Sequence, residues 1–311
     1  MIKTDVTLRA CGYIAEFRSD LGGNCYRLCH EASGAELRRS PCDEKQLFSE
    51  IFLFGNAILF PPNRIRGGEF EFEGRHYAFP VNEKATGCHL HGELYKTPFC
   101  IAEKTDTRVK FFYTAKAGEY LGFPHAFKLW RTYTLSEDGM EESVTVTNLS
   151  EKNMPFMLAF HTTFNAPFIS GSKTEDCFVK VAVGREHIRH EKYLPTLEYV
   201  GGRERELLMN SGDYPVAAGP LSAFYSCTGR DTTITDRKSG KRIVYESDSD
   251  YGYRMLWRKD GAPYFVAEPQ TSAIDCFHLE APAEEKGLIT VAPGESKTLI
   301  TKFKIEDICK L

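Results

Sequence analysis

Two side chains in this sequence are of the types that acid–base chemistry needs. His161 lies in Phe160-His161-Thr162, and Glu268 lies in Ala267-Glu268-Pro269. A histidine and a carboxylate on the ends of separate strands can supply one proton acid and one proton base. Opening and closing a sugar hemiacetal requires those two proton transfers and little else. The pair therefore predicts an enzyme site, and the surrounding sequence decides how specific that prediction becomes.

The proposed chemistry sets a requirement on the surroundings of both groups. A glutamate with an ordinary pKa of ~4.3 becomes a stronger base when apolar walls remove it from water, and Val266 and Pro269 could supply such walls. Histidine, with a pKa near ~6.5, suits the acid role. Each such group contributes ~10²–10⁴ in rate, which is enough to improve on a reaction that water already performs slowly.

Composition excludes several classes of function. The chain has 311 residues, of which 42% are hydrophobic, so it can bury a large core. Its net charge is −4 and no long basic run occurs, which argues against nucleic acid and anionic membranes as partners. The start, Met1 to Val6, lacks the apolar core of a signal peptide, and no apolar run approaches the ~18 residues of a membrane span. We therefore expect a cytoplasmic protein.

The cysteines are scattered and do not predict a metal site. There are ten, and no CxxC motif occurs. Cys25 and Cys29 are four residues apart, but no second pair completes a zinc site. We expect free thiols that pack as small hydrophobic residues in a reducing compartment.

Short segments that alternate between apolar and polar residues predict half-buried strands along most of the chain. We expect one all-β domain over residues 1–311, a large antiparallel sandwich that closes on itself. The best helical candidate is Asp43 to Ile51, and the polar interval from Arg185 to Gly219 predicts strand-poor insertions at the rim of the sandwich. The alternating segments are 13–17, 69–73, 108–113, 127–133, 143–147, 177–181 and 298–303.

Several short motifs are each weak evidence alone, but their order and spacing together are a strong signal. On them the chain resembles the aldose 1-epimerase (galactose mutarotase) family over nearly its whole length. The resemblance implies the family's β-supersandwich fold, a sugar site on one concave face, and no metal or organic cofactor. The motifs are Gly22-Gly23-Asn24, Asn63-Arg64-Ile65, His91-Gly92, Phe127-Lys128-Leu129 before Tyr133, Asn148 with Met154-Pro155-Phe156, His161 with Phe164-Asn165, Glu268-Pro269-Gln270 and Pro293-Gly294-Glu295-Ser296.

The resemblance also implies roles for individual residues. His161 corresponds to the general acid at the ring oxygen, and Glu268 to the base that removes the anomeric hydroxyl proton. His91 corresponds to a second site histidine, although His89 is an alternative two residues away. Arg64 corresponds to an arginine that holds sugar hydroxyls; the alternative is a structural arginine paired with a carboxylate.

Other candidates have two interpretations each. Asn165 and Gln270 either donate hydrogen bonds to sugar hydroxyls or brace the catalytic side chains. Trp257 either stacks on a sugar face or packs in the core. The family often has a hydroxyl-binding aspartate after the general acid, and neither Asp213 nor Asp231 has a convincing context for it.

The leading hypothesis is an isomerase that interconverts the α and β anomers of a free aldohexose such as galactose or glucose, acting as a monomer or homodimer. One alternative is a hexose-6-phosphate 1-epimerase, which needs a basic cluster, whereas strand alternation sends Arg64 and Arg66 to opposite faces. Another is a non-catalytic carbohydrate-binding protein, which would not need the acid–base pair. Glycoside cleavage usually needs two carboxylates, and only Glu268 has a persuasive context.

Overall fold

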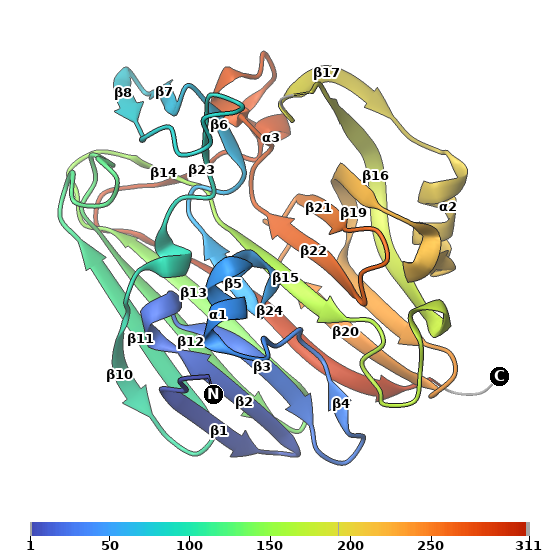
Figure 1. Ribbon diagram of the computed structural model, residues 1–311. Helices are drawn as coiled ribbons and strands as arrows, with labels where there is room; N and C mark the ends of the chain where they lie inside the picture. Colours follow the sequence, from blue (N-terminus) through green and yellow to red (C-terminus); the bar gives the residue numbers. More distant parts are fainter. Residues whose placement is uncertain (1, 192, 309–311) are drawn as a thin grey trace.

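The computed structural model describes residues 2–191 and 193–308, and these form an all-β architecture. A 14-stranded antiparallel sheet curves through the molecule, and a four-stranded sheet lies beside part of it (Figure 1). Ring contacts join the two sheets, since Phe17 lies 6.0 Å from Phe111 and 4.8 Å from Tyr133. The predicted antiparallel sandwich is confirmed.

The strands of the large sheet follow a spatial order that differs from their order in the chain, which brings distant segments together. In that spatial order they are β10 (Cys100–Lys104), β11 (Arg108–Ala115), β12 (Phe127–Ser136), β13 (Gly139–Asn148), β24 (Ser296–Asp307), β20 (Lys241–Ser247), β19 (Leu221–Asp236), β21 (Tyr253–Arg258), β22 (Tyr264–Gln270), β15 (Ala159–Asn165) and β5 (Asn56–Leu59). Strand β16 (Cys177–Arg189) also pairs with β19, and carries β17 (Pro195–Val200) and β18 (Tyr214–Pro215).

The remaining strands form smaller sheets. The four-stranded sheet contains β1 (Val6–Ala10), β2 (Tyr13–Arg18), β3 (Asn24–His30) and β4 (Ala35–Glu36). The two-stranded sheets are β14 (Met154–Phe156) with β23 (Ile289–Val291), β6 (Arg64–Arg66) with β9 (Cys88–Leu90), and β7 (Glu69–Phe72) with β8 (Arg75–Ala78).

Helices are short and lie between strands. The α-helices are α1 (Glu44–Ser49), α2 (Glu204–Ser211) and α3 (Ala283–Lys286), and the 3₁₀ turns are η1 (Ser19–Leu21), η2 (Ile51–Leu53), η3 (Leu94–Lys96), η4 (Thr174–Asp176), η5 (Val216–Ala218) and η6 (Cys276–His278). The helix predicted over residues 43–51 is confirmed as α1, with Asp43 capping it by accepting a hydrogen bond from the Gln46 N–H. None of the helices among the described residues is long and apolar enough to cross a membrane.

One sequence prediction about secondary structure is wrong. The interval 185–219 is not strand-poor, because it contains the end of β16, all of β17 and β18, and helix α2. Charged side chains hide the pattern, because Glu186 and Glu206 are buried and form ion pairs with the exposed Arg203. Strand β17 pairs with β16 alone among the described strands and forms an edge (Figure 1), and all of its side chains except Pro195 are exposed or partly exposed, so its sequence can be polar.

Candidate active site

His161 and Glu268 meet on neighbouring strands of the large sheet. Strands β15 and β22 pair antiparallel with Ala159 opposite Gln270 and Thr162 opposite Ala267, so His161 stands opposite Glu268. Directly opposed residues of an antiparallel pair point to the same face. The His161 Nε2 lies 3.5 Å from the Glu268 Oε1. The structure therefore brings together the two residues that sequence analysis put first.

Burial shifts the proton affinities of both groups. His161 is 7% exposed and Glu268 is 3% exposed. Burial raises the pKa of Glu268 to about 8, against the hydrogen bond from Gln270 and the positive charges of Arg189 and Arg64. Burial lowers the pKa of His161 to about 4. Between those values the pair holds one proton, which resides mainly on Glu268.

The apolar walls that cause this burial come from other strands than expected. Met255 on β21 stands opposite Glu268, and Phe52 in η2 lies 5.8 Å from the His161 ring. Both line the cavity, whereas Val266 and Pro269 are buried but are not among the lining residues. Sequence analysis proposed the chain neighbours of Glu268 as the apolar walls. The walls come instead from the adjacent strand β21 and from the turn η2, which is more than a hundred residues from His161 in the chain.

His91 is held in a defined tautomer by the backbone of Asn63. The Asn63 N–H donates to the His91 Nδ1 at 3.2 Å, and the His91 N–H donates to the Asn63 carbonyl at 2.9 Å. Burial keeps the pKa of His91 well below its usual value, so the ring is neutral with its proton on Nε2. Its ring lies 6.1 Å from that of His161, and it lines the cavity.

A left-handed turn puts His91, and not His89, in the cavity. His91 has φ 66° and Gly92 has φ 63°, and a Cβ on Gly92 would come within 2.0 Å of the Phe60 carbonyl oxygen. His89 lies within β9, where its Nδ1 bonds the Pro80 carbonyl at 2.8 Å and its ring stacks on Phe79. The turn ends the strand alternation, so the two histidines do not share a face.

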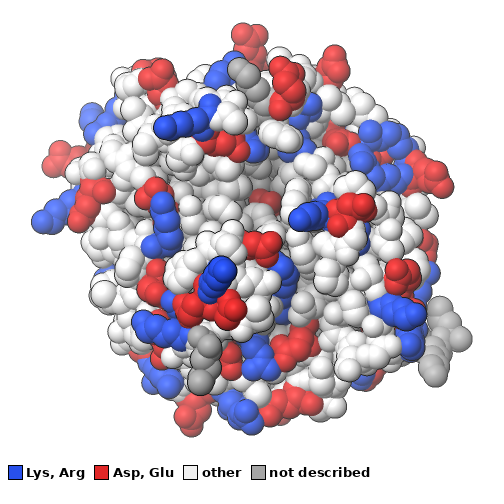
Figure 2. All heavy atoms as spheres, in the orientation of Figure 1, with Lys and Arg blue, Asp and Glu red and all other residues white. Residues whose placement is uncertain are grey.

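These residues surround a cavity of about 700 Å³. Figure 2 shows a hollow near the middle of this face, with acidic and basic side chains mixed around it. One wall comes from the large sheet, another from α1 and η2, and a third from the β6–β9 region. The lining residues are Ser49, Glu50, Ile51, Phe52, Leu53, Asn63, Arg64, Glu83, His91, His161, Arg189, Tyr193, Ser222, Met255, Trp257 and Glu268.

Arg64 both lines the cavity and pairs with a carboxylate. Its Nε donates to one oxygen of Glu83 at 2.6 Å and its Nη2 to the other at 2.7 Å. Its guanidinium lies 4.6 Å from the centre of the Tyr193 ring. A bidentate pair fixes the plane of the guanidinium, so Glu83 orients Arg64 at the edge of the cavity. Arg66 points elsewhere and pairs with Asp275 at 3.2 Å, as the predicted alternation required.

Arg189, at the end of β16, is a cavity residue that sequence analysis missed. Its Nη2 donates to the Ser222 carbonyl at 2.8 Å and to the Ser222 Oγ at 3.0 Å, and its Nη1 lies 3.6 Å from the Met255 Sδ. Burial, followed by the charge of Arg64, lowers the pKa of Arg189. No motif marks this residue, because its position depends on the fold of the β16–β17 hairpin.

Of the other predicted binding residues, one lines the cavity and two do not. Trp257 lines the cavity and stacks on Tyr264 at 6.2 Å, so it combines packing with an exposed ring face. Gln270 is fully buried and donates to the Glu268 Oε2 at 3.1 Å, which braces the proposed base. Asn165 is not a lining residue, and its amide donates to the backbone carbonyls of Glu36 and Arg38.

Neither aspartate considered from the sequence lies at the cavity. Asp213 is exposed and pairs with Arg237, and Asp231 lines separate hollows elsewhere on the molecule. Among the described residues, no group of three or more His, Cys, Asp and Glu side chains could hold a metal ion. The nine described cysteines are free thiols, and Cys309 lies outside the described residues.

Comparison with known sequences points to one family. The sequence profile of the aldose 1-epimerase family matches residues 18–304. The chain is 26% identical to the LacX protein of Lactococcus lactis subsp. lactis over 216 residues, which cover 67% of this chain and 70% of that protein. It is 28% identical to galactose mutarotase of Mus musculus over 143 residues, which cover 46% of this chain and 41% of that protein.

Comparison with solved structures gives the same result for the fold. A galactose mutarotase-like protein from Clostridium acetobutylicum superposes with a TM-score of 0.91 at 28% identity, covering 99% of both chains. A galactose mutarotase-like protein from Lactobacillus casei superposes with a TM-score of 0.73 at 20% identity, covering 97% of this chain and 99% of that one. The predicted galactose mutarotase-like fold is therefore confirmed.

Proposed function

Because the chain belongs to the aldose 1-epimerase family, we propose that it interconverts the α and β anomers of an aldose by acid–base opening and reclosure of the sugar ring. Free aldohexoses such as galactose and glucose are the first substrates to test. The observation that carries the proposal is the contact between His161 and Glu268, 3.5 Å apart and removed from water in a cavity that accommodates a monosaccharide.

The proposed reaction requires one proton acceptor and one proton donor. Glu268 takes the proton of the anomeric hydroxyl while His161 gives a proton to the ring oxygen, and the bond between C1 and the ring oxygen breaks. The open-chain aldehyde rotates about the C1–C2 bond. The ring oxygen then attacks the other face of the carbonyl, with both proton transfers reversed. The pair ends as it began, so no further reactant is consumed.

The protonation state of the His161–Glu268 pair supports this scheme. The pair holds a single proton between pH values of about 4 and about 8, because burial lowers the pKa of His161 and raises that of Glu268. Transfer of that proton from Glu268 to His161 across their contact produces the reactive carboxylate and imidazolium without a change in net charge. A base whose pKa lies near the working pH is well matched to its task.

The remaining residues would bind and orient the sugar. His91 presents an Nε2–H donor for the ring oxygen or a neighbouring hydroxyl, since its Nδ1 already accepts the Asn63 N–H. Arg64, oriented by Glu83, can donate to hydroxyls. Trp257 offers a ring face to sugar C–H groups. None of these roles requires a cofactor.

The test is mutarotation of freshly dissolved α-D-glucose and α-D-galactose, followed by polarimetry. Wild-type protein should accelerate it, and Glu268→Gln should lose ~10²–10⁴ of that acceleration, since the shape is kept and the base is lost. Glu198→Gln, an exposed carboxylate on β17, is the matched control and should behave as wild type. Equal rates for Glu268→Gln and wild type would remove Glu268 from the mechanism.

The same experiment addresses the non-catalytic alternative. A carbohydrate-binding protein would bind sugars without accelerating their mutarotation, and its binding would not need a raised carboxyl pKa. Glycoside cleavage remains disfavoured because the other acidic lining residues are occupied: Glu50 pairs with Arg39 at 3.0 Å and Glu83 pairs with Arg64.

A further inference from the structure

The cavity contains one cation without an acidic partner among the described residues. Arg189 bonds Ser222 and approaches Met255, both of which are uncharged. Its Nε–H makes no hydrogen bond to a described residue, although the side chain is partly buried. A guanidinium that is partly removed from water loses hydration, and no described carboxylate replaces it here. An anion bound at Arg189 would therefore stabilise this arrangement.

The other charges of the cavity are already matched. Arg64 pairs with Glu83 at 2.6 Å, and Glu50 pairs with Arg39 at 3.0 Å. Glu268, with a pKa raised to about 8 by burial, is mostly uncharged near neutrality. His91 and His161 are neutral there, because burial lowers the pKa of each. Arg189 is consequently the lining cation that has no paired carboxylate among the described residues.

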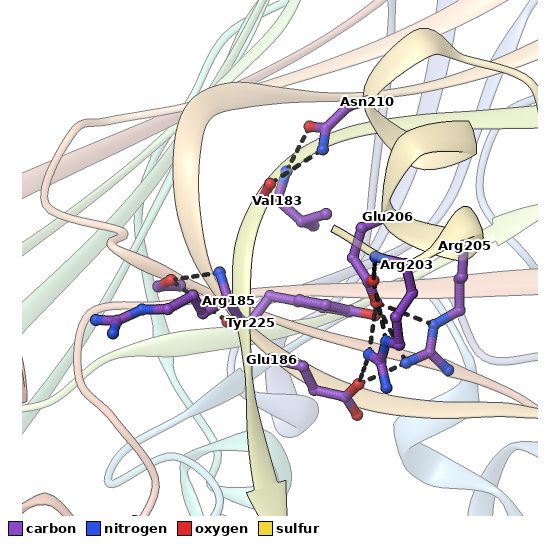
Figure 3. Close-up of polar contacts among 9 residues, drawn as sticks. Val183, Arg185, Glu186, Arg203, Arg205, Glu206, Asn210 and Tyr225 are labelled. Atoms are coloured by element: carbon purple, nitrogen blue, oxygen red, sulfur yellow. Dashed lines mark hydrogen bonds and ion pairs between the residues drawn. The ribbon is translucent and has the colours of Figure 1, made fainter. Parts of the chain in front are cut away.

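The carboxylate nearest to Arg189 along its own strand is used elsewhere. Figure 3 shows Glu186, three residues earlier on β16, bound by Arg203 and Arg205, which flank the start of α2. Glu206 of the same helix accepts from Arg203 and from the Tyr225 hydroxyl at 2.8 Å (Figure 3). This network fastens α2 to β16 and β19. It also leaves Glu186 unable to turn toward Arg189 without breaking two ion pairs.

We propose that the aldose which this cavity accepts carries an anionic substituent, a carboxylate or a phosphate, and that Arg189 binds it. The proposal rests on the 1-epimerase function proposed above and narrows its substrate class. Arginine matches both groups because its planar donors form paired hydrogen bonds with carboxylate and phosphate oxygens. Ser222 holds one edge of the guanidinium, so the Nε–H remains available to a ligand.

Arg189 lies against the wall of the cavity that carries the proposed base. It lies close enough to Glu268 and Arg64 for their charges to shift its pKa, so it belongs to the same cavity as the acid–base pair. Ser222, which accepts its hydrogen bonds, stands opposite Trp257 where β19 pairs with β21. Trp257 is two residues along β21 from Met255, and Met255 stands opposite Glu268 where β21 pairs with β22. A ring with one face over Trp257 and C1 at Glu268 would therefore lie along the wall where Arg189 bonds Ser222 and approaches Met255.

The test compares anomer exchange of neutral and anionic aldoses by NMR exchange spectroscopy. D-glucose and D-galactose are the neutral substrates, D-glucuronate and D-galacturonate carry a carboxylate, and the two hexose 6-phosphates carry a phosphate. We expect at least one anionic class to have a kcat/KM about 10- to 100-fold above its neutral parent, the size of a charge-assisted hydrogen bond. Which class gains identifies the anion.

Variants assign the preference to Arg189. Arg189→Gln should bring the anionic-to-neutral ratio of kcat/KM toward one, and Arg189→Lys should restore part of it, since charge returns without the paired donors. Arg185→Gln is the matched control, because Arg185 is exposed on the same strand and lies over Tyr199 outside the cavity. It should keep the wild-type ratio.

Binding measurements keep the two proposals separable. Calorimetry with the same six sugars gives Kd values for wild type, Arg189→Gln and Glu268→Gln. Tighter binding of an anionic sugar that Arg189→Gln loses supports the inference even if no sugar is turned over, a result that would overturn the epimerase proposal alone. Equal kcat/KM and Kd for neutral and anionic sugars, or an unchanged ratio in Arg189→Gln, overturns the inference while leaving the epimerase intact.

Discussion

Two buried glutamates in this molecule have opposite surroundings. Glu142 on β13 receives hydrogen bonds from Arg131 at 2.8 Å and from the Asn56 amide at 2.5 Å, and Arg38 lies 3.6 Å away. Glu268 on β22 receives one hydrogen bond from Gln270 and contacts His161, and no arginine of the described residues is in hydrogen-bond contact with it. Burial among cations holds a charge in place, whereas burial among neutral groups makes the charge unfavourable and the proton affinity high.

The two sites also share a strand and therefore depend on each other. Thr162 follows His161 on β15, points to the opposite face, and donates to the Asn56 side chain, which in turn donates to Glu142. The ion-pair cluster thus fixes the strand that carries the proposed acid. The Glu142 cluster therefore helps to position His161 and Glu268, which have few polar contacts of their own.

The largest expected effect is on stability at Glu142. Glu142→Gln would leave Arg131 and Arg38 buried without a counter-charge, so we expect the free energy of unfolding to fall by about 3–5 kcal/mol. Urea denaturation followed by circular dichroism measures it. Glu141→Gln is the control, because Glu141 is adjacent to Glu142 in the chain but is only partly buried and pairs with Lys302 at the surface. A loss at Glu142 no larger than at Glu141 would contradict the contrast between the two buried sites.

The second prediction concerns the pH dependence of turnover. The pair holds one proton only between the two pKa values, so kcat/KM should be bell-shaped with limbs near pH 4 and 8. Below the lower limb both groups are protonated and no base remains; above the upper limb neither is, and no acid remains. Rates of anomer exchange across that range, corrected for buffer catalysis, measure the profile. A profile without an upper limb would mean that Glu268 titrates as an ordinary carboxyl.

How far the sequence predicts this site depends on the range of the contacts. His161 and Glu268 are recognisable because each lies in its own short motif. The choice between His89 and His91 needed the left-handed turn, which strand alternation does not anticipate. Arg189 could not be found, because its role depends on where β16 ends relative to β19. Local patterns predicted the strands well, but they failed from residue 185 to 219, where ion pairs to buried carboxylates such as Glu206 replace apolar alternation.

The third prediction is that Glu268→Gln stabilises the protein as the pH rises. The unfolded carboxyl ionises near 4.5 and the folded one near 8, so the unfolded state of the wild type binds fewer protons in between. Wild-type stability therefore falls across that window and levels off above it. The variant lacks this slope, so its advantage should grow to a few kcal/mol at most. Unfolding free energies at pH 5, 7 and 9 test it, and a constant difference would rule out the raised pKa.

The smallest expected effect comes from Gln270, which bonds the proposed base without lining the cavity. Its amide donates to the Glu268 Oε2 at 3.1 Å, and this bond favours the carboxylate and lowers its pKa. Gln270→Leu should therefore move the upper limb of the pH profile upward by less than about one unit, the value of one hydrogen bond. A purely structural residue would lower kcat and leave the limb in place. A downward shift of the upper limb would mean that removing the amide lets water reach Glu268, and that this solvation lowers the pKa by more than the lost hydrogen bond raises it. Glu268 would then be less firmly buried than Glu142.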